Sequence, residues 1–191
     1  MRSTAAALTG AAVLVGAAVL TGCSTAEPGA AHDLPTDGPL VVGGESGVLC
    51  LTDKGATEFA YGSNTVANRG SSEATIFKVT LQGSSGFELT NAYLVQATEV
   101  AGSWSEFPPP SAGLEASVFD WTGRVTAVGA AVKPGTALKQ QLNLVAHLKR
   151  DPQVAHPSVE ALAVDYKVDG RKYRTLSTVA LRVVEDSVTN C

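Results

Sequence analysis

Residues 161–184 read ALAVDYKVDGRKYRTLSTVALRVV. Apolar side chains stand at every second position from Leu162 to Val168, which is the period of a strand with one buried face. The dipeptide Asp169-Gly170 follows, and both residue types accept the positive φ angles of a type I′ turn. A second run extends from residue 172 to residue 184. This stretch therefore predicts an antiparallel hairpin with strands near 160–168 and 172–184.

The same period of two continues towards the N-terminus. Residues 74–82 and 87–96 alternate on either side of the Gly83-Ser84-Ser85-Gly86 turn, and each predicts a half-buried strand. In the first, Thr75, Phe77, Val79 and Leu81 stand at alternate positions, and in the second Phe87, Leu89, Asn91, Tyr93 and Val95 do so. Residues 136–150 are compatible with a helix, but their period of two favours a strand.

The chain as a whole predicts about eight or nine short strands. They are expected near 48–52, 57–61, 64–68, 74–82, 87–96, 124–132, 137–149, 160–168 and 172–184. Regular short strands separated by Gly, Pro and Asn, without a long helical pattern, indicate an all-β fold, an antiparallel β-sandwich.

Two short motifs carry a resemblance that refines this fold. Residues 65–70 (TVANRG) followed by 74–79 (ATIFKV) are similar to a pattern of immunoglobulin-like domains in secreted bacterial proteins, and residues 132–135 (VKPG) resemble their later turn. The resemblance implies an immunoglobulin-like sandwich. The Cys-Trp-Cys core of antibody domains is absent, because Cys50 and Cys191 stand near the two ends of the predicted domain.

The first residues of the chain predict an export signal. Residues 3–26 contain no charged side chain and follow Arg2, which matches a short basic segment and an apolar segment of a signal peptide. An uncleaved membrane-spanning helix is the alternative, because about 20 apolar residues cross a bilayer. The stretch Leu20-Thr21-Gly22-Cys23 is similar to the lipobox of bacterial lipoproteins, and the chain resembles small actinobacterial lipoproteins of unknown function.

The lipobox resemblance implies where the mature protein resides. Residues 1–22 would be removed and Cys23 would carry a thioether-linked lipid on the extracytoplasmic face of the cell membrane. Residues 24–47 are rich in Gly, Pro, Ala and acidic residues, so residues 23–47 are expected to form a flexible linker before a β-sandwich domain at 48–191.

Two cysteines remain in the mature chain, Cys50 and Cys191. Export places them in an oxidising compartment, where an even pair usually forms a disulfide. A metal site or a redox pair is the alternative, but the two residues are far apart in sequence and the chain has no C-x-x-C motif.

Charge and motifs exclude several functions. The net charge is −4, which disfavours nucleic acid as a partner. Motifs for nucleophilic catalysis such as G-x-S-x-G and S-x-x-K are missing, and the single methionine is Met1, so a Met-ligated copper site is excluded. His147 and His156 are expected to be surface residues. We therefore expect no catalytic residue, no metal and no cofactor.

Residues 97–123 interrupt the strand pattern and contain both tryptophans. Trp104, Phe107 and Trp121 are candidates for a binding loop, because aromatic side chains favour contacts with partners; alternatively, the tryptophans fold back over the open end of the sandwich. Long loops in compact domains are often functional.

Three functions follow from these features. The first is a binding module at the cell envelope that contacts the membrane through its lipid and presents this loop to an envelope protein or a cell-wall polymer. The second is an envelope-polymer hydrolase that uses Glu106, Glu115 or Asp120, and the third is a carrier with an apolar pocket for a small ligand.

Basic residues gather around the predicted hairpin at Lys167, Arg171, Lys172 and Arg174. They either meet anionic headgroups and wall polymers or form a solvated tip.

Overall fold

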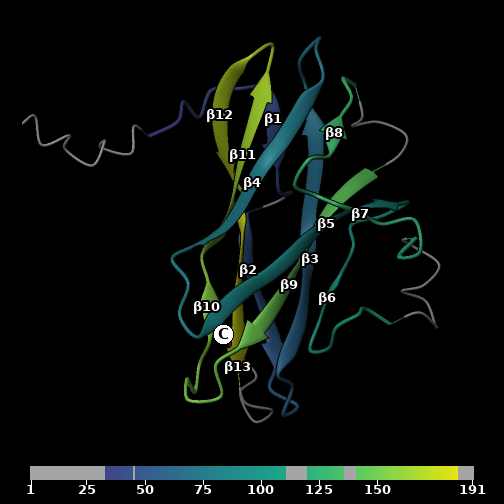
Figure 1. Cartoon of the computed structure of the whole chain (residues 1–191). Helices are drawn as coiled ribbons and strands as arrows, with labels where there is room; N and C mark the ends of the chain where they lie inside the picture. Colours follow the sequence, from purple (N-terminus) through teal and green to yellow (C-terminus); the bar gives the residue numbers. More distant parts are fainter. Residues whose placement is uncertain (1–32, 45, 111–119, 136–140, 185–191) are drawn as a thin grey trace, which may run out of the picture. The chain divides into compact units, whose positions relative to one another are not determined.

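The computed structural model describes residues 33–44, 46–110, 120–135 and 141–184. These residues form 13 strands in three sheets, and they contain no helix (Figure 1). Sheet A has the order β1 (Leu40–Val42), β3 (Glu58–Asn68), β9 (Gln141–Arg150), β5 (Phe87–Ala97), β7 (Val125–Thr126), with β6 (Ser103–Trp104) also paired to β3. Sheet B has the order β10 (Ser158–Val159), β13 (Val179–Val184), β2 (Gly47–Thr52). Sheet C has the order β12 (Arg171–Leu176), β11 (Ala161–Val168), β4 (Ala74–Gln82), β8 (Ala131–Val132).

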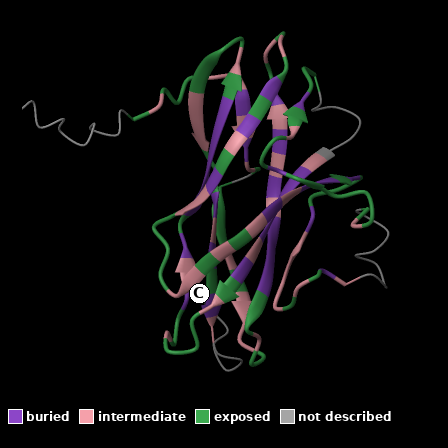
Figure 2. Cartoon of the chain, in the orientation of Figure 1, coloured by how far each residue is buried: buried purple, intermediate pink, exposed green. Residues whose placement is uncertain are grey.

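One hydrophobic core joins the three sheets. Its buried side chains come from β3, β5 and β9 of sheet A, from β13 of sheet B and from β4 and β11 of sheet C, and they appear as the purple interior of Figure 2. Tyr61, Tyr166 and Phe59 are the largest of them. Sheets B and C follow one another along the chain, since β10 precedes β11 and β12 precedes β13. The prediction of an all-β sandwich is therefore confirmed.

The hairpin predicted around the Asp169-Gly170 turn is confirmed. Strands β11 and β12 pair antiparallel from Val168↔Arg171 to Ala163↔Leu176. Asp169 and Gly170 form the turn with φ angles of 48° and 80°, as a type I′ turn requires.

The single strand expected at 172–184 is wrong, because the chain changes sheets within it. The backbone N–H of Leu162 donates to Ser177 Oγ, and Ser177 N–H donates to the Leu162 carbonyl, which ends the pairing of β12 with β11. After Thr178, strand β13 runs parallel to β2 in sheet B. The sandwich is thus not purely antiparallel, although every other strand pair is.

Two β-bulges divide residues that alternate regularly in the sequence. In β4 the register shifts at Phe77, so Ile76 lies in the core before the shift and Val79 lies in it afterwards. In β5 it shifts at Thr90, so Leu89 packs on the core whereas Tyr93 faces the other side of sheet A. An extra residue transfers all later side chains to the opposite face, and alternation alone does not reveal it.

Several strand boundaries also differ from the prediction. The strands expected at 57–61 and 64–68 are one strand, β3, with an irregularity between Tyr61 and Asn64. The strand expected at 124–132 is two short strands, β7 and β8, in different sheets. Strand β9 extends to Arg150, while residues 136–140 lie outside the described residues.

The compact unit begins before residue 48. The unit starts at Asp33, and Leu40 and Val42 of β1 are both 1% exposed. A three-residue strand between Pro39 and Gly43 is too short to show a period of two. The linker prediction therefore rested on the Gly, Pro and Ala content of the residues around it. Within the part of the chain that the structure describes, no helix is long and apolar enough to cross a membrane.

Candidate functional site

A second hydrophobic cluster lies on the face of sheet A that points away from the core. Ala60 of β3, Val95 of β5 and Val145 of β9 form its floor, and all three are fully buried. They alternate along their strands with core residues, so their side chains point outward. Water would reach this apolar floor if no other part of the chain covered it.

The segment that follows β5 supplies this cover. Ala101 N–H donates to Asn143 Oδ1 at 3.2 Å, and Asn143 Nδ2 donates to the Glu99 carbonyl at 3.4 Å. The Ala101 carbonyl accepts from Ser63 N–H at the irregularity of β3. Gly62 is adjacent to the Gly102 carbonyl, with no room for a Cβ atom. These bonds hold the segment against the outer face of sheet A.

Four rings continue this cover towards β7, and we call them the aromatic cluster: Tyr93, Phe107, Trp121 and His147. Phe107 lies parallel to the His147 imidazole, with centroids 3.6 Å apart and an interplanar angle of 6°. The Phe107 ring is also 5.5 Å from Trp121 at 87°. Tyr93 stands 5.4 Å from Trp121 and 6.0 Å from Phe107. Such edge-to-face and stacked pairs add stability beyond the buried area.

A cation stands at the edge of the aromatic cluster. The guanidinium of Arg124 lies 4.9 Å from the Trp121 ring and 5.8 Å from the Tyr93 ring, within cation–π range. Its Nη1 donates to the Trp121 carbonyl at 3.1 Å. Arg124 is exposed, while Tyr93, Phe107 and Trp121 are only partly buried. The cluster therefore presents parts of three aromatic rings and a positive charge to solvent.

His147 is placed in an unusual environment for a strand histidine. Burial lowers its pKa below the ordinary value, and the Glu58 carboxylate, 3.7 Å from Nε2, opposes this shift. Nε2 is buried without a hydrogen-bond partner in the described structure. His147 was expected on the surface, and it does lie on the outward face of β9, but the Phe107 ring covers it. Its ring packs flat against Phe107, and no nucleophile is among its contacts with the described residues.

The carboxylates considered for a hydrolase have other surroundings. Asp120 Oδ1 accepts from Thr122 N–H and Gly123 N–H at 3.0 and 3.1 Å and from the Thr122 hydroxyl, and these bonds lower the pKa of Asp120. The carboxylate thus builds the turn that carries Trp121. Glu106 is exposed, and Glu115 lies outside the described residues.

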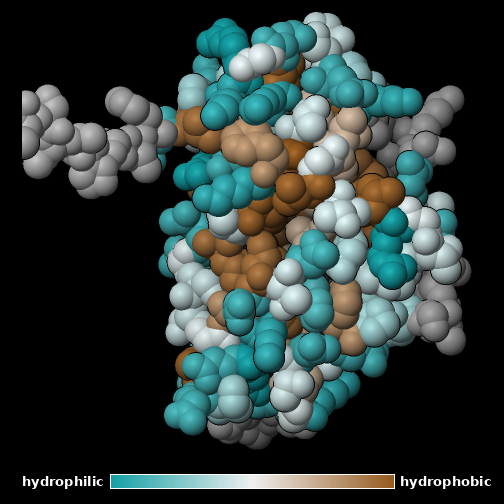
Figure 3. All heavy atoms as spheres, viewed as in Figure 1, coloured by the Kyte–Doolittle hydropathy of each residue, from teal (hydrophilic) through white to brown (hydrophobic). Residues whose placement is uncertain are grey.

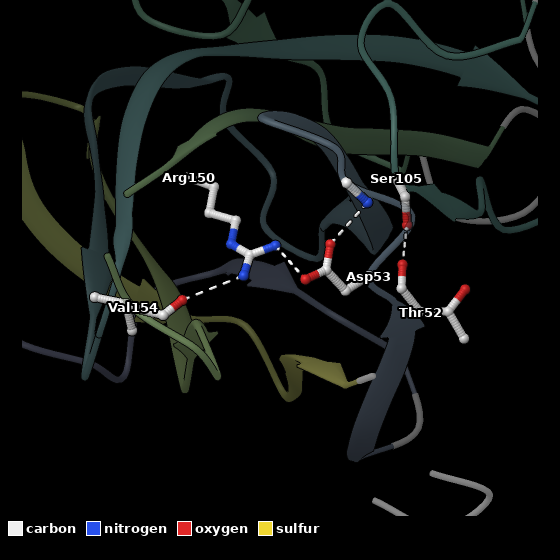
Figure 4. A network of polar contacts seen from close by, with 6 residues as sticks. Thr52, Asp53, Ser105, Arg150 and Val154 are labelled. Atoms are coloured by element: carbon white, nitrogen blue, oxygen red, sulfur yellow. Dashed lines mark hydrogen bonds and ion pairs between the residues drawn. The ribbon is translucent and has the colours of Figure 1, made fainter. Parts of the chain in front are cut away.

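A polar network at the C-terminal end of β9 is structural (Figure 4). Arg150 Nη1 lies 2.6 Å from Asp53 Oδ2, and Arg150 Nη2 donates to the Val154 carbonyl. Asp53 Oδ1 accepts from Gly55 N–H; the Arg150 bond and then this one lower the pKa of Asp53. Nearby, Ser105 Oγ donates to the Thr52 carbonyl. The network ties the end of β2 to β9 and to the segment after β6.

An open hollow lies beside this network. Its walls are Gly86, Phe87, Glu88, Lys149, Arg150, Asp151 and Pro152. It lies at the surface, not between the sheets, so it does not correspond to the apolar pocket that a small-ligand carrier needs. Among the described residues, no group of three or more His, Cys, Asp or Glu side chains is placed to hold a metal ion.

The structure brings together part of the site that the sequence indicated. Phe107 and Trp121 belong to the aromatic cluster, and Trp104 packs beside it on the same floor. Tyr93, His147 and Arg124 were not predicted to join them. Alternation in the sequence places Tyr93 on the same face as Leu89, because it does not reveal the bulge in β5. For Arg124, the sequence offered one signal of its place in the cluster, its position three residues after Trp121. Of the other predicted residues, Cys50 is exposed on β2, and Cys23 and Cys191 lie outside the described residues.

Comparison with known proteins gives no family. No protein-family model matches the sequence, and no curated protein matches it. One solved structure with a distant likeness is titled "Structure of Vibrio cholerae VesB protease". It shares 11% identity and a TM-score of 0.35, and the alignment covers 76% of this chain but 31% of that one. A likeness at this level carries no argument about fold or activity, so the function of the chain has to be inferred from its own residues.

Proposed function

We propose that the protein is an exported lipoprotein that uses its sandwich as a binding module at the cell envelope. Signal peptide removal would expose Cys23, whose thiol accepts a diacylglyceryl group, and acylation of the new amino group would add a further chain. Two or three acyl chains give stable membrane attachment where one is marginal. The domain is then held on the extracytoplasmic face of the cell membrane.

The observation that carries the binding function is the aromatic cluster on the outer face of sheet A. A covering layer needed only for stability would bury its rings, yet Tyr93, Phe107 and Trp121 all remain partly exposed beside Arg124. Trp, Tyr and Arg are the residue types that most often dominate binding energy at protein interfaces. Val125, which pairs with Leu94, adds an apolar side chain that is 53% exposed.

The geometry of the rings favours a protein partner over a sugar polymer. Sugars stack on a flat and open ring face, but Trp121 is inclined by 70° to Tyr93 and by 87° to Phe107, and Arg124 lies over its ring. Rings inclined to one another with an adjacent cation suit the mixed side chains of a protein surface. The partner is therefore another protein of the envelope.

A site-specific crosslinking experiment tests this function. A photoreactive residue is placed at Val125, beside the aromatic cluster, and in a matched control at Val48 of β2, which is 49% exposed. In the native envelope we expect a defined protein adduct from position 125 and none from position 48. Loss of the adduct in the Trp121→Ala background would connect it to the cluster. Equal labelling from both positions would refute the assignment.

We also propose that Cys50 and Cys191 form a disulfide. Cys50 is exposed on β2, and β13 runs alongside β2 until Val184, which pairs with Thr52. Cys191 is the seventh residue after Val184, and seven steps of about 3.3 Å suffice for the chain to turn back by the two positions from Thr52 to Cys50. The bond would close a loop of most of the domain. Mass measurement of the mature chain before and after reduction and alkylation tests this pairing.

A further inference from the structure

The strands of sheet C carry a concentration of positive charge that the whole chain lacks. They contain five basic residues and one acidic residue, whereas the net charge of the chain is −4. The basic residues are Lys78, Lys167, Arg171, Lys172 and Arg174. The single acidic residue, Asp165, is 4% exposed. Hydrophilic side chains crowd the end of the molecule where β11 and β12 meet (Figure 3).

The one carboxylate among these strands is already neutralised. Arg174 binds Asp165 through two bonds, Nε to Oδ1 at 2.7 Å and Nη2 to Oδ2 at 3.0 Å. This bidentate ion pair neutralises the negative charge of Asp165 within the sheet. The exposed lysines of the same strands therefore present their charge outward.

Two of these lysines face one another directly. Lys167 of β11 and Lys172 of β12 are partners in the hairpin register, and their Nζ atoms lie 5.6 and 5.7 Å from the ring of Phe77. Like charges in opposite positions of an antiparallel pair are destabilising. The bulge in β4 turns Phe77 towards the same outer face and supplies partial compensation. An anion bound between the lysines would relieve the repulsion fully.

The N-terminal part of the compact unit runs along the edge of this sheet. Arg174 N–H donates to the Pro35 carbonyl at 2.9 Å, and Gly38 packs so closely on Tyr166 and Tyr173 that a side chain would not fit. The described chain begins at Asp33, beside Arg174, and the purple segment before β1 passes next to β12 in Figure 1. Nine residues lie between Cys23 and Asp33, and the ten steps from one to the other span at most about 35 Å.

We propose that the outer face of sheet C, with Lys167, Lys172 and Phe77 at its centre, docks on anionic phospholipid headgroups of the membrane. The proposal rests on the anchoring of Cys23, because a short tether that leaves beside Arg174 keeps this face near the lipid surface. Phosphate groups then bind between the two lysines, and the Phe77 ring lies at the level of the headgroups. The aromatic cluster on sheet A would remain available for its partner.

The test uses the mature chain, residues 23–191, with Cys23→Ser so that no acyl chain contributes. Binding is measured by co-sedimentation with mixed phosphatidylglycerol and phosphatidylcholine vesicles and with phosphatidylcholine vesicles alone. Each lysine near an anionic surface contributes about fivefold to the partition coefficient, so Lys167→Gln with Lys172→Gln should reduce binding roughly 25-fold. High salt should reduce it as well, because the Debye length falls from about 10 Å at 0.1 M to about 3 Å at 1 M.

A matched variant separates the position of the charges from their number. Lys54→Gln with Lys149→Gln removes the same charge from two exposed lysines outside sheet C. Vesicle binding of this variant should stay close to that of the protein without these substitutions. Three results would overturn the proposal. They are an equal loss of binding in both double variants, equal binding to both vesicle types, and retention on an anionic wall polymer without binding to vesicles. Because the acyl chain is absent, these results are independent of the Cys23 anchor, whose failure would be seen in the release of full-length protein from membranes.

Discussion

Substitution of Phe107 by Ala tests whether the aromatic cluster is a packed part of the fold. Complete truncation of a buried Phe costs about 3–5 kcal/mol. Phe107 is only partly buried, but its ring contacts His147, Tyr93 and Trp121, so we expect Phe107→Ala to lower the free energy of unfolding by about 2 kcal/mol. Urea unfolding monitored by circular dichroism measures this loss.

The same variant should change the titration of His147. Burial is the main cause of its lowered pKa, so removal of the ring that covers it should raise the pKa towards the ordinary value of 6.5. In the unfolded state of the unsubstituted protein, His147 binds a proton as the pH falls below 6.5. In the folded state its pKa is lower, so it binds the proton only at a lower pH. Stability is therefore complete above this pH and declines as the pH falls towards the folded pKa, and the decline should be shallower in Phe107→Ala.

Nuclear magnetic resonance of the imidazole protons measures this pKa, and His156, which is exposed, serves as the control within the same spectrum. A stability loss below about 0.5 kcal/mol, the level of an ordinary surface substitution, together with an unchanged His147 pKa would refute the packing described for the cluster.

Three other perturbations have defined outcomes. Cys23→Ala should release the folded domain from the membrane, and protein that stays bound on fractionation would indicate an uncleaved N-terminal helix. Cys50→Ser should lower stability by up to about 5 kcal/mol relative to the oxidised parent, the chain-entropy limit for a loop of this length, as measured by urea unfolding, and the reduced parent should unfold like the variant. Gly62→Ala should push the Gly102 carbonyl away from sheet A, because a Cβ atom has no room there. It should thereby shift the tryptophan emission to longer wavelength, while Gly44→Ala, where a Cβ meets nothing, should not.

The sequence was informative where interactions are local. The hairpin of β11 and β12 was predictable because both its turn and its period depend on adjacent residues, and Asp169-Gly170 accepts the required φ angles without help from the rest of the fold. The candidate site was predictable only in part. Trp121 and Phe107 were evident from composition, but their partners were not.

The chain by itself thus indicated the all-β fold and the aromatic character of the 97–123 segment, and it predicts the export signal before Cys23. Tertiary structure decided which face each side chain occupies. The bulges at Phe77 and Thr90 invert the faces of two strands, and they bring Phe77 to the two lysines and Tyr93 to Trp121. A bulge depends on how a strand pairs with its neighbour, and that neighbour lies far away in the sequence. For this physical reason, the order of the residues indicated the basic hairpin and the aromatic loop, but not that Phe77 lies beside the two lysines or that Tyr93 and His147 join Trp121 and Phe107.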